Sequence, residues 1–121
     1  MVQLRTILKA ADNSGAKRLM IIGISTKIGK KATLADVVLC TVKGADSQGA
    51  VADHEKVRVL IVRTKKEFRR KDGSYVRFDD NAGVVIDKQG LPRGTRILGP
   101  IAREIKEAGY NKIASLAREV V

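Results

Sequence analysis

Aromatic residues, cysteine and long apolar runs are all scarce in this chain of 121 residues. It has no tryptophan, and its two phenylalanines and two tyrosines are too few for a protein that stacks single-stranded nucleic acid on aromatic side chains. The single cysteine, Cys40, excludes an internal disulfide and a cysteine-based zinc cluster. The longest apolar run, residues 19–24, is far shorter than the ~20 residues of a membrane helix. Since a secretory signal is also missing, we expect a soluble intracellular protein.

Acidic residues are few compared with basic ones. The chain has 24 Lys and Arg against 13 Asp and Glu, which gives a formal net charge of +11. Self-repulsion of this kind disfavours a compact state unless a polyanionic partner neutralises it. Nucleic acid is therefore the first candidate partner, and an anionic membrane surface is the second. The apolar fraction of 44% indicates a folded domain rather than a disordered basic tail, and the length suits one core.

Short strand-like segments separated by turns make up most of the first ninety residues. In residues 57–63, VRVLIVR, the apolar side chains are too continuous for a strand with one solvent-exposed face, which is typical of a central strand covered on both faces. Asp72 and Gly73 form the strongest hairpin turn signal, because this pair tolerates the positive φ angles of tight turns. The predicted strands are residues 5–11, 18–25, 35–43, 56–66, 75–78 and 83–87.

After Pro92 the pattern changes to that of a short helical tail. Residues 95–98 could pair as a last short strand, and apolar residues then recur at helical spacing over 101–108 and 111–117. The sequence predicts a mainly β fold, a small five-stranded antiparallel β-barrel with a C-terminal tail of two short α-helices. We expect a single domain over residues 1–121, with the barrel at about 1–98 and the tail at about 99–121.

No catalytic or metal-binding motif is present. The chain lacks the phosphate-binding loop, the nucleophile elbow and the HExxH zinc motif. The only histidine, His54, is best interpreted as a solvated loop residue, and Cys40 as a small buried apolar residue. Asp79 and Asp80 have the composition of a turn. We therefore predict that the protein is not an enzyme and that it uses no cofactor and no metal.

Basic residues are concentrated in one predicted hairpin. The fifteen residues from Arg63 to Arg77 contain seven cations and only two anions, whereas a solvating surface normally mixes charges of both signs. Smaller basic groups occur at residues 17–18 and 30–31. A mixture of Arg and Lys suits the backbone of a structured RNA, since Arg can hold phosphate in a bidentate fork. The cations at 69–71 are predicted to lie on an exposed tip.

Three runs of sequence carry a resemblance to a known family. They are ADNSGAKR from Ala11, VLIVRTKKEFRRKDGSYVRFDDNAGVVI from Val59, and GTRILGPIAREI from Gly94. In order and spacing they resemble ribosomal large-subunit protein fourteen in its bacterial form, and the likeness covers essentially the whole chain.

The resemblance implies a structural constituent of the large ribosomal subunit in the cytoplasm, without membrane contact. It implies contacts with large-subunit rRNA, with neighbouring large-subunit proteins, and across the subunit interface with small-subunit rRNA in intersubunit bridges. It also implies docking of a ribosome-silencing factor on Thr95, Arg96 and Lys112. The expected RNA-binding residues are Lys17, Arg18, Lys30, Lys31, Arg63, Lys65, Lys66, Arg69, Arg70, Lys71 and Arg77.

One segment departs from the family pattern. The family usually carries a lysine-rich loop between the third and fourth strands, whereas this chain has Asp46, Asp53 and Glu55 in residues 45–56, so RNA contact by this loop stays open. Two alternatives from other classes remain. A free-standing oligonucleotide-binding barrel acting as a nucleic-acid chaperone would need exposed aromatic residues, and an enzyme of small-barrel fold would need a cluster of acid and base groups.

Overall fold

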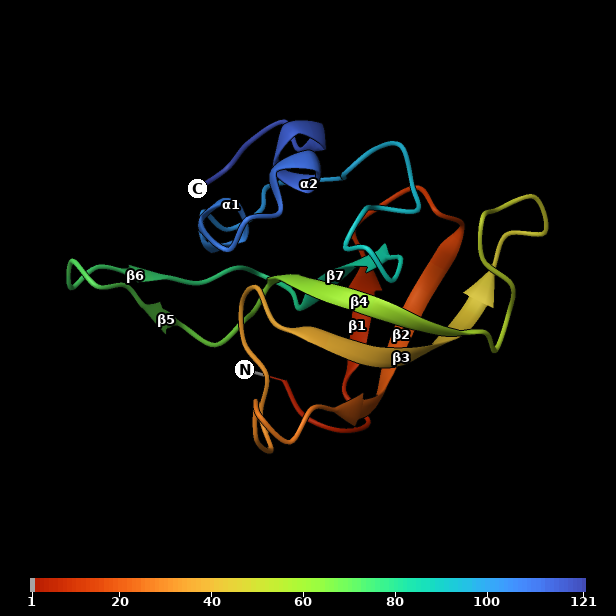
Figure 1. Ribbon diagram of the computed structural model, residues 1–121, viewed down its shortest axis with the longest axis horizontal. Coiled ribbons are helices and arrows are strands. Elements are labelled where there is room, and N and C mark those ends of the chain that lie inside the picture. Colours follow the sequence, from red (N-terminus) through yellow and green to blue (C-terminus); the bar gives the residue numbers. More distant parts are fainter. Residues whose placement is uncertain (1) are drawn as a thin grey trace.

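A closed ring of five strands, a projecting hairpin and two short helices make up residues 2–121, the part of the chain that the computed structural model describes (Figure 1). The predicted fold class is confirmed. Around the barrel the strands are β1 (Ile7–Ala10), β2 (Ala16–Ile24), β3 (Val37–Ala45), β4 (Lys56–Arg63) and β7 (Ala82–Ile86). The hairpin contains β5 (Phe68–Arg69) and β6 (Tyr75–Val76), and the tail contains α1 (Glu104–Glu107) and α2 (Asn111–Leu116).

The barrel closes through one parallel pair. β1 and β7 run in the same direction, with Lys9 opposite Ala82 and Ala10 opposite Gly83, while the other neighbours in the ring are antiparallel. A ring with an odd number of strands cannot alternate direction all the way round, so at least one pair must be parallel. The expected antiparallel barrel therefore has one parallel seam, and Lys9 lies on it.

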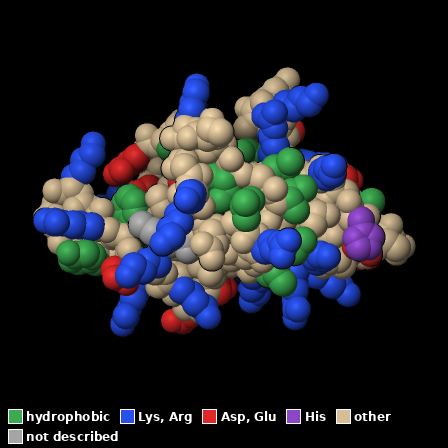
Figure 2. Space-filling view, turned by 90° about the horizontal axis from the view of Figure 1, so that it is seen from below, with side chains coloured by type: hydrophobic (Ala, Val, Ile, Leu, Met, Phe, Trp, Pro, Cys, Tyr) green, Lys and Arg blue, Asp and Glu red, His purple; other side chains and the backbone are tan. Residues whose placement is uncertain are grey.

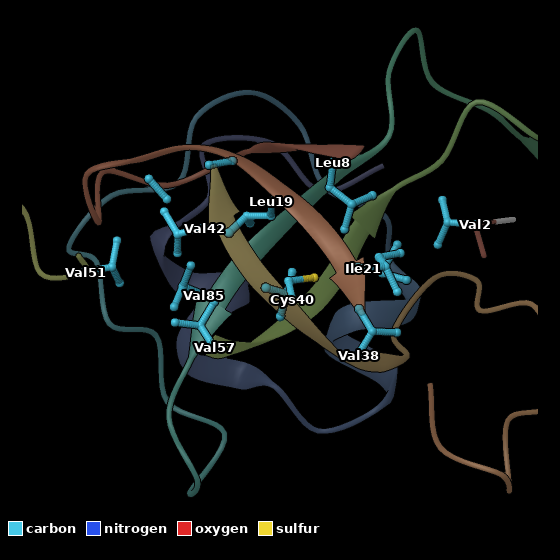
Figure 3. Close-up of a cluster of buried hydrophobic side chains, with 14 of the residues drawn as sticks. Val2, Leu8, Leu19, Ile21, Val38, Cys40, Val42, Val51, Val57 and Val85 are labelled. Carbon is cyan, nitrogen blue, oxygen red and sulfur yellow. The ribbon is translucent and has the colours of Figure 1, made fainter. Parts of the chain in front are cut away.

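The barrel interior is filled by alternate side chains of its strands. In β2 and β3 one face is buried and the other faces solvent, as the period-2 pattern predicts. Figure 3 shows Leu19, Ile21, Cys40 and Val42 pointing into this interior, where all four are fully buried. The barrel is thus a packed core rather than a ligand cavity, and binding must take place on its outer surface.

A second core lies outside the barrel, between β4 and the tail. Leu60 and Val62 on the outer side of β4 pack with Ile101, Ile105 and Ile113. Burying such a side chain contributes about 1.5 to 3 kcal/mol, so the three isoleucines hold the tail firmly on the barrel. The prediction that this strand is covered on both faces is confirmed for residues 59–62, whereas Arg58 at its start is exposed. Neither helix has the length and apolar character needed to cross a membrane, and no other helix occurs within residues 2–121.

The segment expected to form a last strand, residues 95–98, does not do so. It makes one isolated bridge, between Asp12 and Ile97. The N–H groups of Thr95 and Arg96 instead donate to Oδ1 of Asn13, at 2.7 and 2.9 Å. Because a side chain occupies these donors, no strand ladder can form there.

The hairpin beyond β4 is less regular than predicted. The strand ends at Arg63 rather than at residue 66, and β5 and β6 share only two residue pairs. The predicted turn is confirmed, because Gly73 has a φ of 88° and Asp72 accepts hydrogen bonds from the N–H and hydroxyl of Ser74. The hairpin strands therefore form a separate two-stranded sheet, which projects from the barrel in Figure 1.

Candidate nucleic-acid interface

The cations predicted to bind RNA fall into an exposed group and two exceptions. Arg63 is buried and Arg70 is half-buried. The exposed group is Lys17, Arg18, Lys30, Lys31, Lys65, Lys66, Arg69, Lys71 and Arg77. In Figure 2, Lys and Arg side chains follow the lower edge of the view from its left end, where the hairpin lies, and others project from the upper edge. The exposed group provides the positive charge that a polyanion can reach.

Arg63 is a structural residue, contrary to the prediction that it contacts RNA. Only 6% of the residue is exposed, and its Nε lies 3.0 Å from Oδ1 of Asp80. One terminal nitrogen donates to the carbonyl oxygens of Leu98 and Pro100, at 3.0 and 3.2 Å. A Cβ on Gly99, which has a φ of +80°, would overlap this guanidinium. The side chain therefore joins the end of β4 to the start of the tail and is not available to a ligand.

Arg70 ties the hairpin to the tail. Its Nε lies 2.7 Å from Oε1 of Glu104 in α1, and the two side chains are only 17% and 13% exposed. A terminal nitrogen of Arg70 also donates to the carbonyl oxygen of Val121. The prediction that all three cations of the tip are exposed is therefore wrong for Arg70, whereas its neighbours Arg69 and Lys71 are exposed. Sequence alone could not identify the partner, because Glu104 lies 34 residues further along the chain.

Two shallow surface hollows gather cations that are far apart in the sequence. The first, of about 420 Å³, is lined by Lys17 and Arg18 of β2 and by Lys65 at the base of the hairpin. The second, of about 360 Å³, is lined by Lys31 and Lys66. Asn81 lines both hollows, so they are neighbours at the end of the barrel from which the hairpin projects.

The turn between β1 and β2 is a hub of internal hydrogen bonds. Asp12 is buried and accepts from the hydroxyl of Ser14 at 2.8 Å and from the N–H of Val85 in β7 at 3.0 Å. Burial raises the pKa of Asp12, and these hydrogen bonds partly oppose the rise. Asn13 holds the segment after Pro92 through the bonds described above. The turn fixes the start of β2, where Lys17 and Arg18 emerge into solvent.

The predicted partner-docking residues are exposed but are not joined to one another. Oδ1 of Asn13 accepts the N–H groups of Thr95 and Arg96, which fixes both backbones, and the hydroxyl of Thr95 accepts from Nδ2 of Asn13 at 2.8 Å. Lys112 lies in α2. Within residues 2–121, no hydrogen bond or ion pair connects Lys112 to Thr95 or Arg96.

The acidic loop between β3 and β4 folds back onto the barrel. Oε2 of Glu55 lies 2.7 Å from Nη1 of Arg93, whose other terminal nitrogen donates to the carbonyl of Ala50 at 2.7 Å. The hydrogen bond from Arg93 is the main reason why the pKa of Glu55 is lowered. Val51 is buried in the barrel core. Where the family pattern has lysines, this loop therefore has an acidic residue, Glu55, that pairs with Arg93 and holds the loop against the barrel.

The described residues offer no assembly for catalysis. Cys40 is buried, and desolvation raises the pKa of its thiol to about 12, which keeps it protonated and unreactive. His54 is exposed and lies 3.5 Å from its neighbour Asp53. Within residues 2–121, no group of three or more His, Cys, Asp or Glu side chains is arranged so that it could hold a metal ion. The surface feature that stands out is a set of exposed Lys and Arg side chains carried by the closed barrel and its hairpin.

Comparison with known proteins gives one consistent result. The whole chain, residues 1–121, matches the family described as ribosomal protein L14p/L23e. It is 56% identical over 121 residues to the large ribosomal subunit protein uL14 of Aquifex aeolicus and to that of Aquifex pyrophilus, with 100% of each chain covered. It is 54% identical to the protein of the same name from Petrotoga mobilis, with 99% of each chain covered. The likeness thus includes the barrel, the hairpin and the tail.

Proposed function

The chain belongs to the ribosomal protein L14p/L23e family, and on that premise we propose that its exposed cations bind the phosphate backbone of large-subunit rRNA. A protein of this family is a structural constituent of the large subunit of the cytoplasmic ribosome and not an enzyme. RNA binding by named residues, bridges to the small subunit and docking of a silencing factor are the further parts of the proposal.

One observation carries the RNA-binding proposal. Lys17, Arg18 and Lys65 come from two distant parts of the chain and line a single open hollow, and Lys31 and Lys66 line the next one. Asp80 also lines the first hollow but is paired with Arg63, so the cations there are in excess, and their mutual repulsion costs stability unless a polyanion is bound. Phosphates of a folded RNA meet this need, and Lys and Arg are the usual groups that contact them.

The hairpin supports a role at the subunit interface. It projects beyond the barrel (Figure 1), and Arg69 and Lys71 on it are exposed while Arg70 fastens it to α1. A fixed arm with free cations can reach small-subunit rRNA while the barrel cations hold large-subunit rRNA. Neighbouring large-subunit proteins are the other expected partners.

The silencing-factor surface is proposed for Thr95, Arg96 and Lys112. All three are exposed, and Asn13 fixes the backbone of the first two. A backbone that is already fixed loses little entropy when a partner binds, which favours its use as a docking edge. The two helices beside it rest on the same second core as β4.

Salt dependence of binding tests the RNA proposal. The nine exposed cations lie within the range of about 6 to 10 phosphate contacts, for which affinity falls by about 10³ to 10⁵ between roughly 50 and 200 mM salt. We expect a fall of this size when the protein is titrated with a large-subunit rRNA transcript. Replacing Lys17, Arg18 and Lys65 with glutamine should make the dependence shallower, whereas Lys88→Gln, a change to an exposed lysine outside the proposed surface, should not. An affinity that does not change with salt would contradict the proposal.

A further inference from the structure

Lys9 lies where it can connect the basic groups of the proposed interface. It belongs to β1, and its residue is exposed on the outside of the barrel. It lines the same hollow as Lys17, Arg18 and Lys65. In the sequence Lys9 is an isolated basic residue between Leu8 and Ala10, so only the fold places it beside the other cations.

Strand register extends this group to a third strand. Lys9 is directly opposite Arg18 of β2, and Arg18 is directly opposite Lys43 of β3. Neighbouring strands lie about 4.8 Å apart, so the three residues form a row about 10 Å long across the outer face. We call Lys9, Arg18 and Lys43 the cation row.

Nothing within residues 2–121 neutralises the cation row by direct contact, because none of its three side chains makes a hydrogen bond or an ion pair. Two residues along each strand, the neighbouring row on the same face consists of Ile7, Met20 and Thr41, which carry no charge. Two anions lie near the row: Asp80 lines the same hollow as Lys9 and Arg18 but is paired with Arg63, and the pKa of Asp53 is lowered mainly by the N–H of Gly44, with Lys43 as a lesser cause. Like charges directly opposite on a sheet are destabilising, so the row is unfavourable in the free protein.

Asn81 fixes the position of Lys9 relative to the hairpin. Its backbone carbonyl accepts the N–H of Lys9 at 2.9 Å, and its side-chain Oδ1 accepts the N–H of Lys65 at 2.8 Å. One residue therefore holds the backbones of the two lysines together at the parallel seam of the barrel. The row of β1–β3 thereby continues into the cations at the base of the hairpin.

We propose that Lys9, Arg18 and Lys43 form a phosphate-binding row that continues through Lys65, and that one rRNA strand follows it across the outside of the barrel. This inference rests on the RNA-binding function proposed above and adds Lys9 and Lys43 to its binding residues. Each nucleotide of an rRNA strand carries one phosphate charge, so a strand that follows the row can bring successive phosphates to its cations.

The test compares Lys9→Gln and Lys43→Gln with Lys88→Gln, an exposed lysine beyond the other end of β7 that changes net charge equally. The probe is a large-subunit rRNA transcript, titrated at several salt concentrations. Each row variant should reduce the slope of log affinity against log salt by about 0.7 to 0.9, and Lys88→Gln should not. The thermal midpoint should stay the same or rise, because a like-charge repulsion is removed.

Conservative variants separate charge from structure. Lys9→Arg and Lys43→Arg should restore the slope of the wild type, and failure to restore it would overturn the proposal. If the row variants behave like Lys88→Gln while the wild type keeps its steep salt dependence, the row is not a binding site although the proposed function stands. If the wild type itself shows no salt dependence, the proposed function fails first. Normal binding to naked rRNA with lost incorporation into the large subunit would assign this face to a protein neighbour instead and overturn the row.

Discussion

Arg63→Ala should destabilise the fold strongly, although Arg63 is the first cation of a basic hairpin. The change removes the ion pair with Asp80 and the hydrogen bonds to the carbonyls of Leu98 and Pro100. Breaking a buried ion pair costs about 3 to 5 kcal/mol. Because the Asp80 side chain is 34% exposed, water can partly replace its partner, and we take about 3 kcal/mol, the lower end of that range.

The expected shift is large enough for a thermal melt. At about 4 °C per kcal/mol for a domain near this length, Arg63→Ala should lower the midpoint by about 12 °C. Urea denaturation followed by circular dichroism should give the matching loss of unfolding free energy at an unchanged slope. Arg63→Lys keeps the charge but cannot reproduce the planar fork, so it should fall between the wild type and the alanine variant.

Arg69→Ala is the matched control, since Arg69 is exposed in the same hairpin. It should leave the unfolding free energy within about 0.5 kcal/mol of the wild type and should reduce the salt dependence of RNA binding. Arg63→Ala should show the opposite pattern, provided that RNA binding is measured well below its melting temperature. If Arg63→Ala has the same thermal midpoint as the wild type and its slope of log affinity against log salt is smaller by about one, the structural role assigned to Arg63 is refuted.

The main features of the fold follow from local patterns in the sequence. The continuous apolar residues of β4 predicted a strand buried on both faces, and the helical spacing after Pro92 predicted the elements that cover it. Asp72 and Gly73 predicted their turn from backbone preference alone. These features depend on neighbouring residues, which is why they can be predicted without a structure.

The partners of charged side chains could not be predicted in the same way. The sequence gives the sign of Arg63 and Arg70 but not the positions of Asp80 and Glu104, which lie 17 and 34 residues away. Within a basic run, an arginine with a buried partner and one free in solvent have the same sequence pattern. Long-range packing determines, for each cation separately, whether it is paired inside the protein or exposed to solvent.

The cation row escaped prediction for a related reason. Lys9 and Lys43 are single cations within apolar strands, so a search for clusters along the sequence passes over them. They meet Arg18 only through the registers of two strand pairs. Alternation could have placed all three on the outer face, but not in one row, because a slip of two residues keeps the face and changes the neighbour.

Two further predictions concern contacts that hold peripheral segments on the barrel. Arg70→Ala should lower the unfolding free energy by about 3 kcal/mol in urea denaturation, because Glu104 is left buried without its partner, and a midpoint equal to that of Arg69→Ala would contradict this tether. The pKa of Glu55 is lowered by Arg93, so the unfolded chain binds more protons than the folded one below the ordinary value of 4.5. The contribution of this pair to stability is therefore present above pH 4.5 and is lost as the pH falls through the lowered value. Glu55→Gln should be less stable at neutral pH and should lose less stability on acidification, whereas parallel pH profiles for the two proteins would show that the pair contributes nothing.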